Sequence, residues 1–320
     1  MSLPDVVALA GVHPYYLKAL ATCFTVHKMD AAMDDAALNA VAPHIVGIAS
    51  SGESKVPATL MARFPELKIV SVFGVGYDGV DLAHARSRGI AVTHTPGVLT
   101  DDVADLALAL MLAVARSVCL ADQHVRLGKW PQGGLPLGRK VSGARLGIVG
   151  FGRIGQAIAQ RAKAFDMDVA YTARTEKAGT GFTFHPTAKA LAAAVDFLVV
   201  ITPGGEHTHH LINADVLESL GSAGYLINVA RGSVVDEEAL VAALQNGVIA
   251  GAGLDVFARE PQVPEALWSM PNVVLTPHMA SATVQTREAM ANLAFANMQA
   301  GTSGQPVLTM VPELSGDSAA

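Results

Sequence analysis

Three polar residues late in the chain have side chains that could act together in one reaction. Arg231, Glu260 and His278 each follow an apolar run that is typical of a buried strand. In a parallel sheet the carboxyl ends of the strands lie along one edge, where ligands bind, so we expect the three side chains around one crevice between two domains. Taken singly, each also has an ordinary structural interpretation: a surface ion pair, a turn before Pro261, and a helix cap.

This set of side chains suits the reduction of a carbonyl group by hydride transfer. His278 would act as the acid in reduction and as the base in oxidation. A carboxylate at Glu260 would favour the imidazolium and orient the ring. Arg231 could bind the carboxylate of a 2-oxo acid through two N–H groups and polarise the carbonyl.

A glycine turn in the middle of the chain predicts where the hydride donor binds. Gly150, Gly152 and Gly155 have the G-x-G-x-x-G spacing between a strand-like and a helix-like run. We expect Gly150 to permit the turn, Gly152 to admit a pyrophosphate, and Gly155 to let the helix pack closely. Arg153 and Ile154 begin that helix, whose N–H groups and dipole favour phosphate. The alternative is a purely structural strand-to-helix turn.

The next strand-like run indicates which dinucleotide binds. It ends in Ala173, Arg174 and Thr175, where NAD sites usually place an acidic residue on the ribose 2′-hydroxyl. Arg174 could pair with a 2′-phosphate, and Thr175 could add a hydroxyl. We therefore predict NADP(H) rather than NAD(H); the alternative is that Arg174 is a solvated loop residue.

Composition narrows the class of protein. A chain of 320 residues with 51% hydrophobic and 5% aromatic residues is expected to form two α/β domains. The net charge of −6 gives no sign of the basic surface that nucleic-acid-binding proteins usually carry, so we expect no nucleic-acid partner. Cys23 and Cys119 form no disulfide framework, which predicts a cytoplasmic protein. The apolar run at residues 106–115 is too short to span a bilayer, so we expect no membrane partner. Residues 206–210 contain three histidines in one loop, which we interpret as solvated rather than as a metal site.

Strand-like and helix-like segments alternate along the chain, which predicts parallel sheets with right-handed crossovers. We expect five strands at residues 5–8, 23–26, 45–49, 68–73 and 90–93, then six at residues 146–149, 169–172, 197–201, 225–229, 253–256 and 273–275. One long helix is expected from Thr100, its N-cap, to about Leu127, and a last helix over residues 282–299. The predicted fold is a pair of doubly wound α/β domains. A Rossmann dinucleotide-binding domain (100–281) is inserted into a discontinuous, flavodoxin-like substrate-binding domain (1–99 plus 282–320).

Over nearly its whole length the chain resembles the D-isomer-specific 2-hydroxyacid dehydrogenase family, and within it the NADPH-dependent glyoxylate/hydroxypyruvate and hydroxyphenylpyruvate reductases. The resemblance lies in residues 73–81, 95–105, 150–155, 229–232, 253–257, 260–261 and 277–278. It implies the same catalytic roles for Arg231, Glu260 and His278. It further implies cofactor contacts at Thr100, Thr202, Pro203, Val229, Ala230 and Asp255, and substrate contacts at Ser51, Gly52, Val75 and Gly76. The helix after Thr100 and the loop at Trp130 resemble the family's dimerisation arm, which implies a homodimer.

Several alternatives stay open on the sequence. An NAD(H)-sensing corepressor of the C-terminal-binding-protein type would share the fold, although Arg174 disfavours NAD. A formate dehydrogenase would not need the acid–base pair, and a D-3-phosphoglycerate dehydrogenase would need a further regulatory domain. The preferred 2-oxo acid (glyoxylate, hydroxypyruvate or an aryl pyruvate), the physiological direction, and whether Trp130 or Leu135 reaches the substrate are not decided by these residues.

Overall fold

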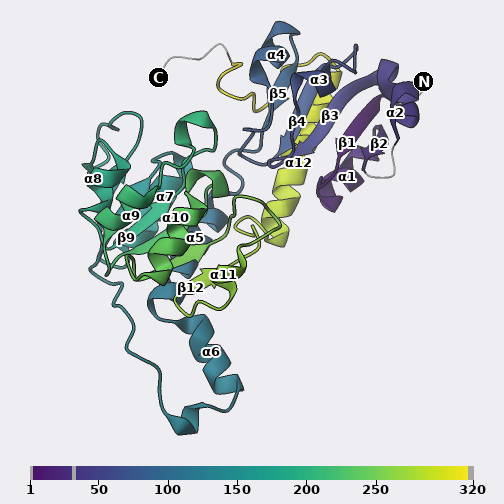
Figure 1. Ribbon diagram of the computed structural model, residues 1–320. Helices are drawn as coiled ribbons and strands as arrows, with labels where there is room; N and C mark the ends of the chain where they lie inside the picture. The colour runs from purple at the N-terminus through teal and green to yellow at the C-terminus, as the bar shows by residue number, and fades with distance from the viewer. Residues whose placement is uncertain (1–2, 31–33, 316–320) are drawn as a thin grey trace. The chain divides into compact units, whose positions relative to one another are not determined.

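The computed structural model describes residues 3–30 and 34–315, so residues 1–2 and 316–320, at the two ends of the predicted substrate domain, lie outside the described part. The chain divides into two compact units, one made of Met1–Leu99 with Ala282–Ala320 and the other of Thr100–Ser281 (Figure 1). Each unit is built on one wholly parallel sheet with helices. The predicted class, two parallel-sheet α/β domains, is confirmed.

The first unit has five strands in the order β2-β1-β3-β4-β5, all of them parallel, which is the flavodoxin-like order. The strands are β1 (Asp5–Leu9), β2 (Thr25–Met29), β3 (Ile45–Ser51), β4 (Ile69–Phe73) and β5 (Ala91–Thr93). The helices are α1 (Pro14–Leu20), α2 (Asp35–Val41), α3 (Ala58–Met61), α4 (Leu82–Ser87) and α12 (Val284–Thr302), with a 3₁₀ turn η1 (Ala42–His44). Strand β2 begins later than predicted, because the N–H groups of Cys23 and Phe24 still bond to the Leu20 carbonyl at the end of α1.

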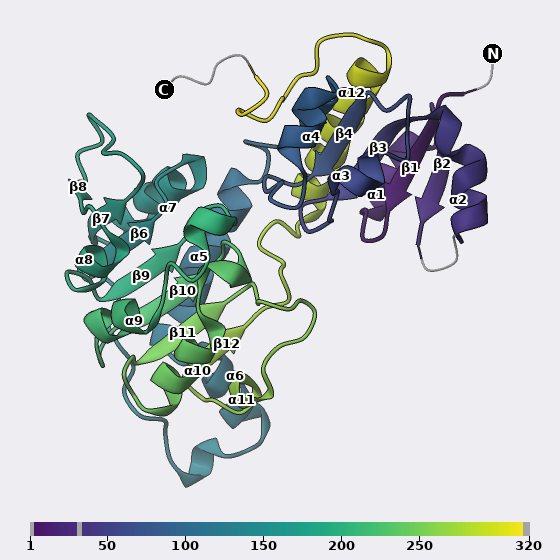
Figure 2. The same cartoon turned by 45° about the horizontal axis from the view of Figure 1, so that its top comes forward.

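The last helix packs on the first unit, as Figure 2 shows beside β4. The carbonyl of Ala294 in α12 accepts hydrogen bonds from Tyr16 Oη (3.3 Å) and Ser71 Oγ (3.0 Å). Beyond the helix, the chain forms an antiparallel bridge with β5 through Thr93 and Met310. The first unit is therefore discontinuous in sequence.

The second unit has seven parallel strands in the order β12-β11-β10-β9-β6-β7-β8. Counted from β6, this is the dinucleotide-binding order 3-2-1-4-5-6 with one further strand. The strands are β6 (Arg145–Val149), β7 (Asp168–Thr172), β8 (Thr183–Phe184), β9 (Phe197–Val200), β10 (Tyr225–Asn228), β11 (Gly251–Leu254) and β12 (Val273–Leu275). All six predicted strands are present. The two-residue β8 was not predicted, because it is too short to leave an alternating pattern.

The helices of the second unit are α5 (Thr100–Ala115), α6 (Val118–Arg126), α7 (Arg153–Lys163), α8 (Ala188–Ala192), α9 (Ala214–Leu220), α10 (Glu237–Gln245) and α11 (Glu265–Trp268). Short 3₁₀ turns lie at η2 (Trp130–Gln132), η3 (Glu206–Thr208) and η4 (Gly232–Val234). Among the described helices, no single one is long and apolar enough to cross a membrane, and only the bent pair α5 and α6 would meet that test together.

The prediction of one continuous helix from Thr100 to Leu127 was wrong. The chain bends by 60° between α5 and α6. Ser117 adopts a left-handed conformation (φ +50°), which interrupts the helix. The carbonyl of Ala115 accepts a hydrogen bond from the N–H of Arg139 at 2.8 Å, so it is not used in a helical hydrogen bond. The first helix begins at Thr100 itself and is mostly buried, whereas α6 has no buried residue and stands out from the sheet (Figure 1).

Candidate active site

The glycine turn between β6 and α7 places each glycine in a different environment. Gly150 has φ +99°, and a methyl group on it would lie 2.8 Å from the backbone nitrogen of Thr202. A methyl group on Gly155 would overlap the carbonyl oxygen of Gly150. Gly152, the N-cap of α7, has no atom within 4 Å of the place a methyl group would take. The turn thus presents the first N–H groups of α7 beside open space, which suits an incoming phosphate.

The loop after β7 lies next to this turn. The N–H of Gly150 donates to the carbonyl of Thr172, the last residue of β7, at 2.9 Å. Buried Phe151 stacks on Tyr171 at 4.1 Å, and the Tyr171 hydroxyl accepts from the N–H of Lys177 at 2.7 Å. These contacts hold the intervening loop, residues 173–177, at the carboxyl edge of the sheet.

Within that loop, Ala173 is half-buried, whereas Arg174 and Thr175 are exposed. Thr202 and Pro203 follow β9, which pairs with β6 on the side opposite β7. The structure therefore brings the glycine turn, residues 173–175 and residues 202–203 together at the point where the strand order reverses. Dinucleotides bind at this point in doubly wound sheets.

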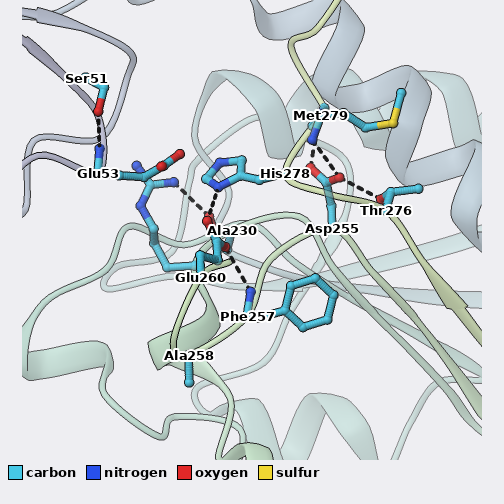
Figure 3. Close-up of polar contacts among 12 residues, drawn as sticks. Ser51, Glu53, Ala230, Asp255, Phe257, Ala258, Glu260, Thr276, His278 and Met279 are labelled. Carbon is cyan, nitrogen blue, oxygen red and sulfur yellow. Dashed lines mark hydrogen bonds and ion pairs between the residues drawn. The ribbon is translucent and has the colours of Figure 1, made fainter. Parts of the chain in front are cut away.

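His278 and Glu260 form a close pair in the second unit (Figure 3). The distance from His278 Nδ1 to Glu260 Oε2 is 2.7 Å, and the two side chains are 28% and 23% exposed. The other carboxylate oxygen of Glu260 accepts from the N–H of Phe257 at 2.9 Å. The contact therefore engages the Nδ1 side of the ring.

The charges around Glu260 favour its ionised form. Burial alone would raise the pKa of this carboxyl group. The hydrogen bonds from His278 and the Phe257 N–H, together with the positive charges of His278 and Arg231, outweigh burial and lower the pKa of Glu260 below its ordinary value. A carboxylate held ionised beside the imidazole in turn stabilises the imidazolium.

The backbone that carries His278 is held by Asp255. His278 has φ +49°, a conformation that is strained for a residue with a side chain, and its N–H donates to the Asp255 carbonyl at 2.8 Å. The fully buried Asp255 carboxylate accepts from the Thr276 hydroxyl (2.6 Å) and from the N–H of Met279 (2.9 Å) (Figure 3). It also accepts from the N–H of Ala280 at 2.9 Å. Burial raises the pKa of Asp255 above its ordinary value, although these hydrogen bonds oppose that rise. Asp255 therefore positions the His278 loop, a role that the sequence did not reveal.

Arg231 lies in the loop after β10, directly after the buried residues Val229 and Ala230. The buried side chain of Asn228 accepts from the Ala230 N–H (3.1 Å) and donates to the Arg231 carbonyl (3.2 Å). A methyl group on Gly232 would overlap the backbone of Phe257. This close approach joins the Arg231 loop to the segment that carries Glu260.

The substrate residues implied by the resemblance lie on two loops of the first unit. Ser51 is the register partner of Phe73, so the loops after β3 and β4 begin side by side. A methyl group on Gly74 would be 3.2 Å from Gly52 Cα, and the carbonyl of Val75 is 3.0 Å from His94 Nδ1. Within this unit the structure brings Ser51 and Gly52 close to Val75 and Gly76.

The remaining candidate residues lie on other elements than the loops described above. Thr100 is the first residue of α5 and is half-buried. Trp130 is 68% exposed in η2, and Leu135 is half-buried in the loop that follows. In the histidine-rich loop, the rings of His209 and His210 stack at 3.9 Å.

Comparison with known proteins adds independent evidence. Residues 108–280 match the family described as D-isomer specific 2-hydroxyacid dehydrogenase, NAD binding domain. The chain is 46% identical over 310 residues to a 2-ketogluconate reductase of Gluconobacter oxydans, covering 97% of this chain and 99% of that protein. It is 49% identical over 267 residues to a hydroxyphenylpyruvate reductase of Plectranthus scutellarioides, covering 83% and 84% of the two chains.

A solved structure is similar over its full length. This is an NADPH-dependent glyoxylate/hydroxypyruvate reductase from Sinorhizobium meliloti in complex with NADP and malonate. It has a TM-score of 0.92 and 49% sequence identity, and the match covers 100% of both chains.

Proposed function

Because the chain belongs to the D-isomer-specific 2-hydroxyacid dehydrogenase family, we propose that it reduces small 2-oxo acids to D-2-hydroxy acids with NADPH. The observation that carries the proposal is the 2.7 Å pair of His278 and Glu260 on strand-end loops of a dinucleotide-binding sheet. The relatives act on several 2-oxo acids, including glyoxylate, hydroxypyruvate and 2-ketogluconate by their names. The proposed substrates are accordingly small 2-oxo acids as a class.

Each residue of the trio has one task in the proposed reaction. A nicotinamide cofactor, when bound, supplies the hydride that adds to the carbonyl carbon. His278 Nε2 donates a proton to the carbonyl oxygen, and Glu260 stabilises the imidazolium before that transfer. The Arg231 guanidinium binds the substrate carboxylate and stabilises negative charge on the oxygen. Asp255 acts through the His278 loop that it holds.

The residues present fit a dinucleotide, and those after β7 favour one with a 2′-phosphate. The open space at Gly152 and the N–H groups of α7 suit a pyrophosphate. No carboxylate occupies residues 173–175, and exposed Arg174 offers two parallel N–H donors to a phosphate. The Sinorhizobium meliloti structure, which contains NADP, supports this preference.

The test of the cofactor preference is Arg174→Asp. We expect the KM for NADPH to rise by about tenfold to a hundredfold, because charge-assisted hydrogen bonds are lost and repulsion is added, while the KM for NADH changes less. Lys177→Asp, in the same exposed loop, is the matched control for the change of charge. An unaltered preference for NADPH in the Arg174 variant would remove this assignment.

The remaining proposals concern the two units and their partners. We propose that the first unit binds substrate through Ser51, Gly52, Val75 and Gly76, and that the second binds cofactor. We also propose a cytoplasmic homodimer in which α6 and the Trp130 loop meet a second copy. The exposure of Val118 (52%), Val125 (54%) and Leu127 (66%) supports this use of α6.

A further inference from the structure

A basic and aromatic cluster in the first unit has no part in the reaction described above. Phe73 ends β4, and the ring of His13 lies nearly parallel to the Phe73 ring (7°) with centroids 5.4 Å apart. The guanidinium carbon of Arg287, in the first turns of α12, is 5.7 Å from the same centroid. Phe73 pairs in register with Ser51 and lies two residues before Val75. The cluster therefore adjoins both loops that we propose for substrate binding.

The hydrogen bonding of His13 identifies which of its ring nitrogens is a donor. His13 caps α1, and its Nδ1 accepts from the N–H of Tyr15 at 3.2 Å. Burial, and then the positive charge of Arg287, lower the pKa of His13 below its ordinary 6.5, so the ring is neutral at pH 7. A neutral imidazole that accepts at Nδ1 carries its proton on Nε2. His13 Nε2 and the Arg287 guanidinium are both donors.

Two donors beside a substrate loop select ligands that carry acceptor oxygens. The Arg287 guanidinium lies against the face of Phe73, where the ring attracts its charge, and the neutral imidazole of His13 adds a further N–H donor. Both donors can bond to the hydroxyl oxygens of a substrate. Glyoxylate has no carbon beyond its aldehyde, so it cannot use such a subsite.

We propose that His13 and Arg287 form a subsite for the hydroxyl groups of longer 2-oxo acids, such as hydroxypyruvate and 2-oxo sugar acids. This inference rests on the proposed function and extends it to the substrate class. The two residues then determine specificity without touching the reacting atoms. The name of the Gluconobacter oxydans relative, a 2-ketogluconate reductase, agrees with this class of substrate.

The test measures kcat/KM with NADPH for glyoxylate, pyruvate, hydroxypyruvate, oxaloacetate and 2-ketogluconate. In the unaltered protein, hydroxypyruvate should exceed pyruvate by about threefold or more, since only the former offers a hydroxyl oxygen. Arg287→Met should lower kcat/KM for 2-ketogluconate by about tenfold to a hundredfold, while glyoxylate changes by less than about threefold. His13→Asn keeps an N-cap acceptor for α1, and we expect it to lower kcat/KM for 2-ketogluconate by about threefold to tenfold.

Arg63→Met is the matched control, because Arg63 pairs with exposed Asp35 on α2, and it should leave every substrate unchanged. Equal losses for glyoxylate and 2-ketogluconate would show that Arg287 and His13 have only a structural role. A preference for oxaloacetate over 2-ketogluconate would overturn the hydroxyl assignment. If Arg287→Met does not fold, Arg287→Lys and His13→Asn still decide the question. Failure to reduce any 2-oxo acid would instead refute the proposed function.

Discussion

Glu260→Gln is the most direct test of the proposed acid–base pair. The substitution keeps the shape of the side chain and removes the charge that lies 2.7 Å from His278 Nδ1. In the carboxylate, Oε1 accepts from the Phe257 N–H and Oε2 faces His278, so an amide, with its single oxygen, cannot place an acceptor at both positions. If the oxygen stays with Phe257, the amide NH₂ group faces Nδ1 and disfavours the imidazolium further. If the oxygen faces His278 instead, the ring still loses the negative charge beside it. In either orientation of the amide, we expect His278 to lose its proton at lower pH.

The expected size of this change follows from the charges. An opposite charge at this distance shifts a pKa by about one to three units. Because both side chains are about a quarter exposed, solvent screens part of the interaction, and we expect Glu260→Gln to remove about 1 to 3 kcal/mol of preference for the imidazolium. Since the two groups titrate jointly, the prediction concerns the apparent pKa of the pair.

The assay follows NADPH oxidation by glyoxylate from about pH 5 to about pH 9, the range in which histidine titrates. Reduction requires the protonated acid, so kcat/KM falls as the pH rises, and this fall should move to lower pH in the variant. Glu218→Gln, an exposed position on α9, is the matched control and should leave the profile in place. An unmoved basic limb, or one displaced to higher pH, would refute the proposed role of Glu260.

Two further predictions concern other parts of the second unit. Gly152→Ala should leave the unfolding temperature within about 2 °C but weaken NADPH binding, measured by fluorescence titration, whereas Gly155→Ala should lower both, because its methyl group meets the Gly150 carbonyl. Asp196→Asn should lower the free energy of unfolding by about 1 to 3 kcal/mol at pH 7, because Asp196 accepts from the Arg145 N–H and side chain. The hydrogen bonds from Arg145 lower the pKa of Asp196, so this contribution is present above its ordinary 3.8 and is lost as the pH falls through the lowered pKa. Urea titrations at decreasing pH, with the exposed Asp215→Asn as control, would contradict the pairing if the difference persisted in acid.

The features that could be predicted from the sequence depend on local pattern. The glycine spacing, followed by a helical run, predicted the turn between β6 and α7, because its demands fall within a few residues. The pairing of Glu260 with His278 also followed from a general rule, because both residues come just after parallel strands. The alternation of strand-like and helix-like segments likewise predicted the parallel sheets, although the order of the strands within them comes from the structure.

Other features depend on contacts between distant segments and left no local signal. The break at Ser117 follows from the bond between Arg139 N–H and the Ala115 carbonyl, which no helical pattern reveals. Thr276 and Asn228 support the loops of His278 and Arg231, yet single polar residues at strand ends are common. The substrate loops of the first unit came only from the resemblance.

The return of α12 to the first unit has a consequence for biosynthesis. The ribosome completes residues 100–281 before it makes the helix that covers β4 and the bridge from Met310 to β5. The unit whose translation starts first is therefore the last to obtain its whole sequence. Until then, the nascent chain carries an uncovered sheet face at Gly47, where Met298 will later sit.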